Sequence, residues 1–255
     1  MIQLTNNTPH HFIIIGSGGT GAYLLRHLLR LVASRDVPHH ITIVDGDNVE
    51  EKNLTRQDFT HKDLGHNKAR SLYRRYTEEY PDLKEQIHLA PAFVQTQEDL
   101  GQLIHFVPNT TPLIIGCVDN HSSRFLIQTM VEAEDTPILW LDTGNTERTG
   151  QVVLGTRHID TLVPDTAKDL FDIKDFQTVI EAFPDSFDPK LNDNPGAQSC
   201  AVEQVSSPQN IAANIMNATA AFGLLNKLMA GEVITHNCIQ FDSINLTMKG
   251  ESYVM

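Results

Sequence analysis

The chain has 255 residues, of which 40% are hydrophobic and 20% charged, and its formal net charge is −13. This length suits one large α/β domain, or one domain with an elaborated lobe, and so acidic a chain is a poor candidate for non-specific nucleic-acid binding. It contains no run of 18 or more apolar residues, and its beginning lacks a basic region followed by an apolar one. We therefore expect no membrane span, no signal peptide and a cytoplasmic location.

The three cysteines, Cys117, Cys200 and Cys238, are far apart and form no Cys-x-x-Cys pair. Their odd number argues against a disulfide framework, and their spacing argues against a four-cysteine zinc site, so no zinc is expected. The twelve histidines are mostly single residues, with two adjacent pairs, and none forms a His-x-x-x-His motif. We expect structural or surface roles for them.

The first elements predict a β-α-β unit. Residues 12–15 are a short apolar, β-branched run that ends at a glycine, as is typical of a buried parallel strand. After a glycine-rich stretch comes an amphipathic helix, with leucines on one face and Arg26 and Arg30 on another. Residues 41–44 form a second buried strand, which ends at Asp45.

The middle of the chain continues this pattern after a polar, irregular stretch. A helix is expected over residues 67–80, where Pro81 stops it, and another over 122–133. Strands are expected at 87–94, 112–118 and 138–142, with 150–155 continuing the sheet. Strands that alternate with helices predict a parallel sheet covered by helices.

The last hundred residues change in composition. Residues 157–199 are rich in Asp, Pro, Phe and Asn and have weak periodicity, which indicates a long loop or a partly helical insertion. Residues 208–229 are helical and apolar nearly all round, so we expect this helix to be buried, with Gly231 at its end. Residues 238–248 alternate moderately and predict a final pair of strands.

The first candidate site is the sequence Gly-Ser-Gly-Gly-Thr-Gly at 16–21, which satisfies G-x-G-x-x-G between a strand and a helix. Glycines let the backbone turn tightly and let a phosphate approach the helix N-terminus. Asp45, at the end of the second strand, could bind a ribose hydroxyl. These features alone leave open a dinucleotide site, another nucleotide site and a purely structural turn.

A set of polar residues that follows the second strand favours a triphosphate-binding site. The set consists of Asp45, Asp47, Asn53, Arg56, Gln57 and Lys68. Cations are needed there to offset the charge that develops on phosphorus and on departing pyrophosphate, whereas an oxidoreductase has no evident need for them. The alternative is a solvated loop with incidental charges.

The third candidate site follows a central strand, where Asp119 and Asn120 precede a helix that carries Arg124. Open α/β sheets bind ligands at the carboxyl ends of such strands. A carboxylate that faces a triphosphate usually holds Mg²⁺. The alternative is that Asp119 or Asn120 caps the following helix.

Together these motifs resemble the ThiF/MoeB/HesA family, bacterial relatives of the ubiquitin-activating enzymes. The resemblance rests on GSGGTG, DGDNVEEKNLTRQ, LGHNKA and CVDNHSSR within residues 12–155, and it resumes at 199–232 and 239–246. Among subgroups, the chain resembles short ThiF-like proteins of plasmid-borne PRTRC cassettes.

The resemblance implies a Rossmann-like α/β fold, with a mostly parallel central sheet flanked by helices and a C-terminal mixed extension. Residues 1–255 would form a single adenylation domain. It would contain a nucleotide-binding core at 12–155, a variable crossover segment at 156–199, and a cysteine-bearing segment with the buried helix and closing strands at 200–255.

The family adenylates a carboxylate, typically the C-terminal glycine of a ubiquitin-like protein or small carrier protein, with ATP and Mg²⁺, and often as a homodimer. Residue by residue, the resemblance implies that the phosphates would lie against Gly16, Gly18, Gly19 and Gly21, and that Asp45, beside Asp47, would bind the ribose. The triphosphate would be held by Asn53, Arg56, Gln57 and Lys68. Asp119, beside Asn120, would hold Mg²⁺. Arg56, Lys68, Asp119 and Cys200 would be catalytic. Cys200 matches the family's conjugating or sulfur-handling cysteine, and an ordinary small residue is its alternative.

Two family features are absent. The chain lacks the two Cys-x-x-Cys pairs that bind structural zinc. Its first arginine is Arg26, inside the helix after the glycine loop, so the family's contact from an N-terminal arginine to a partner's phosphates is not expected. The second absence keeps open a catalytically reduced ATP-binding scaffold. The acidic charge argues against the family's tRNA-modifying dehydratase branch, and Arg56 and Lys68 argue against an NAD-dependent oxidoreductase.

Overall fold

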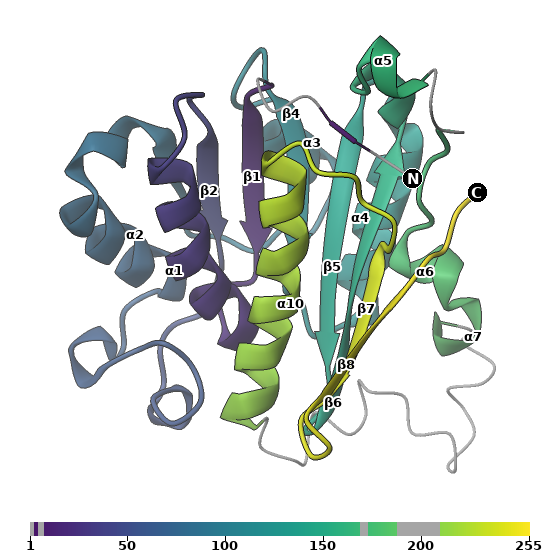
Figure 1. The fold of residues 1–255 in the computed structure, drawn as a ribbon. Helices are drawn as coiled ribbons and strands as arrows, with labels where there is room; N and C mark the ends of the chain where they lie inside the picture. The colour runs from purple at the N-terminus through teal and green to yellow at the C-terminus, as the bar shows by residue number, and fades with distance from the viewer. Residues whose placement is uncertain (1–2, 5–7, 169–172, 188–209) are drawn as a thin grey trace.

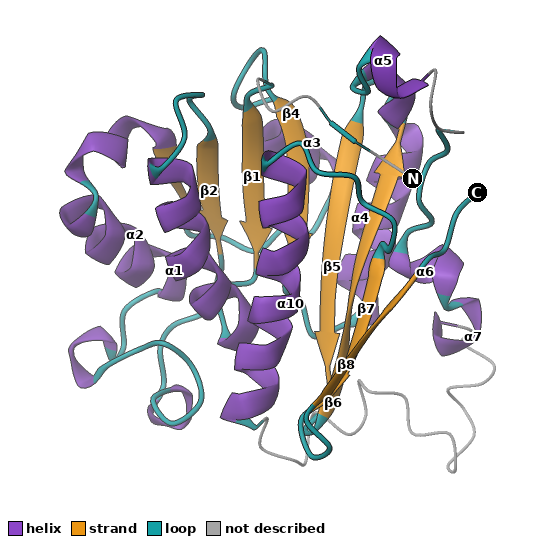
Figure 2. Ribbon diagram, viewed as in Figure 1, coloured by secondary structure: helices purple, strands orange, loops and turns teal. Residues whose placement is uncertain are grey.

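A computed structural model describes residues 3–4, 8–168, 173–187 and 210–255. One eight-stranded sheet, in the order β3-β2-β1-β4-β5-β6-β7-β8, has helices on both faces (Figures 1 and 2). The strands are β1 (His10–Ile15), β2 (His40–Val44), β3 (Ile87–Ala90), β4 (Thr111–Gly116), β5 (Ile138–Asn145), β6 (Thr149–Arg157), β7 (Cys238–Asp242) and β8 (Thr247–Glu251).

The helices are α1 (Gly19–Ala33), α2 (Lys68–Glu79), α3 (Gln97–Ile104), α4 (His121–Ala133), α5 (Asp165–Lys168), α6 (Val179–Ala182), α7 (Pro184–Phe187) and α10 (Ile211–Met229). Short 3₁₀ helices are η1 (Glu51–Asn53), η2 (His61–Asp63), η3 (Pro81–Gln86) and η4 (Ile159–Thr161). Within the described ranges, no helix is long and apolar enough to cross a membrane.

The sheet is parallel from β3 to β5 and antiparallel from β5 to β8. β1 pairs with β2 on one side and with β4 on the other, so the strand order reverses between β1 and β4. At such a switch point the connections leave in opposite directions, which opens a crevice at the carboxyl ends of the strands. The fold is therefore the predicted Rossmann-like α/β fold with a mixed C-terminal extension.

Alternate residues of β1 face two hydrophobic cores. Phe12 and Ile14 pack on the side of α1, α2 and α10, while Ile13 and Ile15 pack on the side of α3 and α4. In Figure 1, α1 and α10 cross in front of the sheet, and α3 and α4 lie behind it. Burial on both faces explains why this strand has no polar alternation.

The expected elements are present, with two differences in the region that follows β2 and α2. The third strand ends at Ala90 and not at residue 94, and the helix α3 was not predicted. A capping box at Thr96 starts α3, but only Leu100 and Ile104 are buried, too few to give a clear period.

The prediction that the last long helix is buried all round was wrong for its first two turns. Ile211 and Ile215, four residues apart, are each 44% exposed. The helix packs on α1 and the sheet with one face, so the opposite face meets solvent. Gly231 ends the helix with a φ of 65°, as expected. Within 157–199, η4, α5, α6 and α7 agree with a partly helical segment.

Five histidines, far apart in sequence, gather at the amino ends of β1, β2 and β3: His10, His11, His39, His40 and His88. The parallel register causes this, since it places His11 opposite His40. The His10 N–H donates to His39 Nδ1 over 3.1 Å, and His40 Nδ1 lies 3.0 Å from His88 Nε2. The described residues contain no group of three or more histidines, cysteines or acids that could hold a metal ion.

Burial lowers the pKa of these histidines. The pKa falls from 6.5 to about 4 in His10 and His39 and to about 3 in His11, mainly through loss of hydration and then through neighbouring cationic groups. A histidine with a lowered folded pKa takes up more protons when the chain unfolds. The free energy of unfolding is therefore not reduced by such a histidine above pH 6.5, and it decreases as the pH falls from 6.5 toward 4.

We predict that the free energy of unfolding falls between pH 7 and pH 5, by up to about 2 kcal/mol for each strongly shifted histidine. Urea unfolding at the two pH values measures it. His39→Asn keeps an acceptor for the His10 N–H but does not titrate, so the fall should be smaller than in the wild type. An unchanged fall would show that these histidines do not cause it.

Candidate functional site

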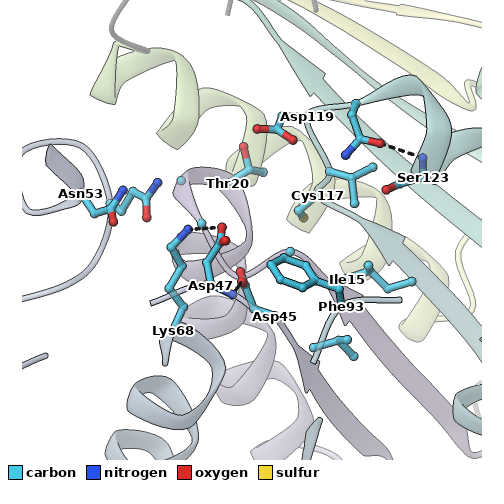
Figure 3. A pocket seen from close by; sticks show the side chains of 18 of the residues that line it. Ile15, Thr20, Asp45, Asp47, Asn53, Lys68, Phe93, Cys117, Asp119 and Ser123 are labelled. Carbon is cyan, nitrogen blue, oxygen red and sulfur yellow. Dashed lines mark hydrogen bonds and ion pairs between the residues drawn. The ribbon is translucent and has the colours of Figure 1, made fainter. Parts of the chain in front are cut away.

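A polar cavity of about 370 Å³ lies at the carboxyl ends of β1, β2 and β4 (Figure 3). Its volume falls within the range of small-molecule sites. Of the predicted site residues, the cavity wall contains Gly16, Gly18, Gly19, Asp45, Asp47, Asn53, Arg56, Gln57, Lys68, Asp119 and Asn120. Gly21 is not in the wall, and Cys200 lies outside the described residues.

Two of the glycines are required by crowding at the end of β1. Gly16 has a φ of 91°, and a Cβ there would lie 2.5 Å from the Cys117 carbonyl oxygen. A Cβ on Gly21 would lie 2.1 Å from the Gly16 carbonyl oxygen, so Gly21 allows α1 to approach the strand. α1 follows Gly18, which offers no side-chain cap, and the first-turn N–H groups are thus available to an anion.

Asp45 ties the glycine loop to the loop after β2. Its Oδ2 accepts the Ser17 N–H over 2.7 Å and the Ser17 hydroxyl over 3.1 Å, and its Oδ1 accepts the Asp47 N–H over 2.8 Å. Oδ1 retains a second lone pair for a ligand hydroxyl. The ribose role of Asp45 stays a prediction, and its structural role is additional.

The part of the cavity wall that follows β2 carries the cations. Lys68 Nζ lies 2.8 Å from Asp47 Oδ2, at the start of α2, and the Lys68 side chain is only 10% exposed. Asn67 caps α2 and also donates to the carbonyl oxygens of Asp45 and Asp47. Lys68 is thereby held at the cavity wall beside the loop that follows β2.

The 3₁₀ turn before Arg56 is shaped by Asn53, whose Oδ1 accepts the Glu50 N–H over 2.8 Å. The turn brings a further cation, Lys52, to the wall, where its Nζ lies 2.6 Å from Glu50 Oε2. Lys52 was not singled out from the sequence, because a lysine next to a glutamate is ordinary on a surface.

Asp119 and Asn120, which follow β4 in the cavity wall, have different roles in the structure. Asn120 Oδ1 accepts the Ser123 N–H over 2.8 Å and caps α4, so the predicted alternative of a helix cap applies to Asn120. Asp119 is exposed, and no hydrogen bond or ion pair joins it to the parts of the chain that the structure describes. Its carboxylate is available to a ligand or a cation.

The charges of the wall fit a nucleotide with Mg²⁺. Four acids line the cavity, Asp45, Asp47, Glu50 and Asp119, against three cations, Lys52, Arg56 and Lys68. A triphosphate in this cavity needs more positive charge than the three cations supply. Mg²⁺ is bound by one or two carboxylates together with substrate phosphates, which is the donor set that Asp119 and a bound nucleotide would provide.

Phe93 lines the same cavity although the residue is 58% exposed (Figure 3). Its ring lies over Gly46, where a Cβ would approach the ring to 2.5 Å. An exposed ring at a cavity mouth can stack on a planar ligand. Sequence analysis missed Phe93 because residues 87–94 were interpreted as one strand.

A buried ion pair supports the loop that carries Asp119. Arg124 Nε lies 2.9 Å from Asp142 Oδ1, and an Arg124 amino group donates to the Val118 carbonyl oxygen over 2.9 Å. Burial raises the pKa of Asp142, and the Arg124 charge opposes that rise. Arg124, first considered with the ligand-binding residues, therefore holds the wall from behind.

We predict that Asp142→Ala lowers the free energy of unfolding by about 3–5 kcal/mol, because it leaves the Arg124 charge buried without a partner. Chemical denaturation measures this. The matched control is Glu147→Ala, which breaks an exposed pair with Arg148 and should cost less than about 1 kcal/mol. Equal effects of the two substitutions would contradict the supporting role.

The two described cysteines are poor nucleophiles. Burial raises the pKa of the Cys117 thiol and of the Cys238 thiol to about 12, so both are protonated at neutral pH. Both are free thiols. Cys117 follows β4 and lines the cavity, whereas the sequence placed it within the strand.

The sheet order, the glycine loop and the cavity at the switch point define a Rossmann-like α/β protein with a candidate nucleotide site. A sequence model of the ThiF family matches residues 6–252, and the chain belongs to this family. The ThiF family comprises adenylyltransferase-like proteins that typically bind ATP and Mg²⁺ and act on ubiquitin-like or small carrier proteins.

Solved structures agree with the fold. The "Crystal Structure of SeMet PaaA" matches with a TM-score of 0.60 at 15% sequence identity, over 98% of this chain and 66% of that chain. At this identity the likeness supports the fold alone. No curated protein matches the sequence.

Proposed function

We propose that the chain catalyses ATP-dependent adenylation of a C-terminal carboxylate on a ubiquitin-like protein, a small carrier protein or a peptide. One observation carries the proposal. A single cavity joins the uncapped start of α1, the cations Arg56 and Lys68, and the carboxylate of Asp119, which has no partner among the described residues. Membership of the ThiF family supports the same reaction.

In the proposed reaction, a carboxylate oxygen of the acceptor attacks the α-phosphorus of ATP. The new bond joins that oxygen to phosphorus, the bond from phosphorus to the bridging oxygen breaks, and pyrophosphate leaves with the electron pair. The first-turn N–H groups of α1 would hold phosphate oxygens, and Arg56 and Lys68 would stabilise the charge on the departing pyrophosphate. Mg²⁺ on Asp119 would supply further positive charge.

Asp47 has a defined part in this proposal. Its ion pair with Lys68 fixes the ammonium group at the cavity wall and occupies only one of the three N–H donors. The other two remain for phosphate oxygens. A cation that is held before the ligand arrives loses less conformational entropy when it binds.

Two finer parts of the proposal rest on family membership. After adenylation, the Cys200 thiolate would attack the acyl carbon of the adenylate, forming a thioester while the bond from that carbon to the phosphate oxygen breaks and AMP leaves. The working unit would be a homodimer, as is common in such folds.

ATP–pyrophosphate exchange with glycine-terminated small proteins tests the adenylation. Because transition-state charge stabilisation would be lost, Asp119→Asn, Arg56→Ala and Lys68→Ala should each reduce exchange about 100-fold or more. Lys62→Ala, an exposed lysine outside the cavity wall, is the matched control and should be neutral. Cys200→Ala should leave exchange intact, because exchange precedes transfer to the thiol.

The same assay separates the alternatives. Binding of ATP without exchange for any acceptor would favour the catalytically reduced scaffold. Binding of NADH in place of ATP would contradict the proposal altogether.

Phe93 provides a second test, because we propose that its ring stacks on the adenine base. Phe93→Ala should weaken ATP binding about tenfold, as expected for one lost base–aromatic contact, and calorimetry measures it. Phe106→Ala is the control, since Phe106 is equally exposed, at 59%, but does not line the cavity. An equal effect of both substitutions would argue against stacking.

A further inference from the structure

Two asparagines of α10, Asn214 and Asn217, are completely buried although they are strongly polar. They lie three residues apart and therefore on one face of the helix. A buried amide is costly unless its donors and acceptors are paired. Their partners are thus informative, and all of them belong to segments that line the cavity.

The two side chains join three segments. Asn214 Nδ2 donates to the Arg56 carbonyl oxygen over 3.1 Å, and its Oδ1 accepts from Asn145 Nδ2 over 3.1 Å. Asn217 Nδ2 donates to Thr20 Oγ1 over 3.3 Å and to Asn145 Oδ1 over 3.2 Å. α10 is thereby bonded to the start of α1, to the turn that carries Arg56, and to the end of β5.

Gly19 gives independent evidence of this contact. A Cβ on Gly19 would lie 2.4 Å from Asn214 Nδ2. Gly19 is not among the residues with positive φ, so its backbone conformation does not require glycine. The Asn214 amide is what leaves no room for a side chain in the first turn of α1.

Stability alone explains Asn217 poorly. Its Oδ1 is buried and has no hydrogen-bond partner in the part of the chain that the structure describes. An unpaired buried acceptor costs about 1–3 kcal/mol. An apolar residue at this position would avoid that cost, so the position serves something besides packing.

We propose that Asn214 and Asn217 are positioning residues of the triphosphate site. Neither lines the cavity. They act through the Arg56 carbonyl and Thr20, by fixing the Arg56 turn relative to the first-turn N–H groups of α1. The triphosphate would have to bridge these two segments, so their spacing sets its affinity. This inference rests on the proposed function.

Calorimetric titration with ATP and with adenosine tests the proposal. Asn214→Ala and Asn217→Ala should each weaken ATP binding about tenfold, the effect of one or two lost hydrogen bonds, and leave adenosine binding within about twofold. If a variant fails to fold, Asn214→Asp replaces it, because it keeps the size of the side chain but places an oxygen against the Arg56 carbonyl.

The matched control is Asn237→Ala. Asn237 is also completely buried, and its Nδ2 donates to the carbonyl oxygens of Leu154 and Gln177 while its Oδ1 accepts the Tyr253 N–H. It does not line the cavity, nor do these partners. Asn237→Ala should lower the melting temperature about as much as Asn214→Ala does, but it should leave ATP affinity unchanged.

A double-mutant cycle tests the Gly19 contact. Gly19→Ala should weaken ATP binding in the wild type, because the methyl group displaces the Asn214 amide, and should have little further effect in Asn214→Ala. If Gly19→Ala reduced ATP affinity equally in both backgrounds, the effect of Gly19 on the site would not act through Asn214.

The outcomes separate this inference from the proposed function. If the wild type binds ATP but Asn214→Ala and Asn237→Ala behave alike, the positioning role is wrong and the proposed function stands. If the wild type binds adenosine and ATP equally, no triphosphate site exists and both are wrong.

Discussion

The crowding around the end of β1 is the constraint on which the site depends. Gly16 donates its N–H to the Val44 carbonyl oxygen over 2.9 Å, while Cys117 donates to Ile15 over 2.8 Å, so β1 remains paired on both sides up to its last residue. The chain must then turn between two neighbouring backbones, and only a residue without a Cβ can do so. The turn starts α1 directly at the carboxyl end of β1, and the first N–H groups of the helix face the crevice that the strand order opens.

Sequence reasoning succeeded where one local pattern determines one structure. The apolar runs of β1, β2 and β4 are buried on both faces and were recognisable without knowledge of their partners. Asn53, Arg56, Gln57 and Lys68 of the cavity wall were found because their spacing after Asp45 is itself a motif. What it missed depends on packing between distant segments. The asparagines of α10 were taken as part of an apolar helix, although Asn214 reaches Arg56, 158 positions away. The five histidines were counted as single residues and pairs, because the register of three parallel strands is not encoded in any one of them.

A chain with a net charge of −13 can hold an anionic ligand only through local arrangement of charge. The wall achieves this partly with backbone dipoles, which add positive potential without adding cations. Arg124 takes no part in that balance, since Asp142 neutralises it behind the wall. The fold therefore uses its charged residues in two ways: charged groups in the cavity wall are available to a ligand, and a buried pair keeps the surrounding loops in place.

The histidine cluster and the cavity lie at opposite ends of the same two strands, β1 and β2. Protons bind the unfolded chain better than the folded one through these histidines, whereas a ligand in the cavity needs the folded chain. The two are thermodynamically linked without any contact between them. Each increment of ligand binding energy displaces acid unfolding toward lower pH, and acidity in turn subtracts from apparent ligand affinity by depleting the folded population. Proton concentration and ligand occupancy therefore influence each other through the size of the folded population.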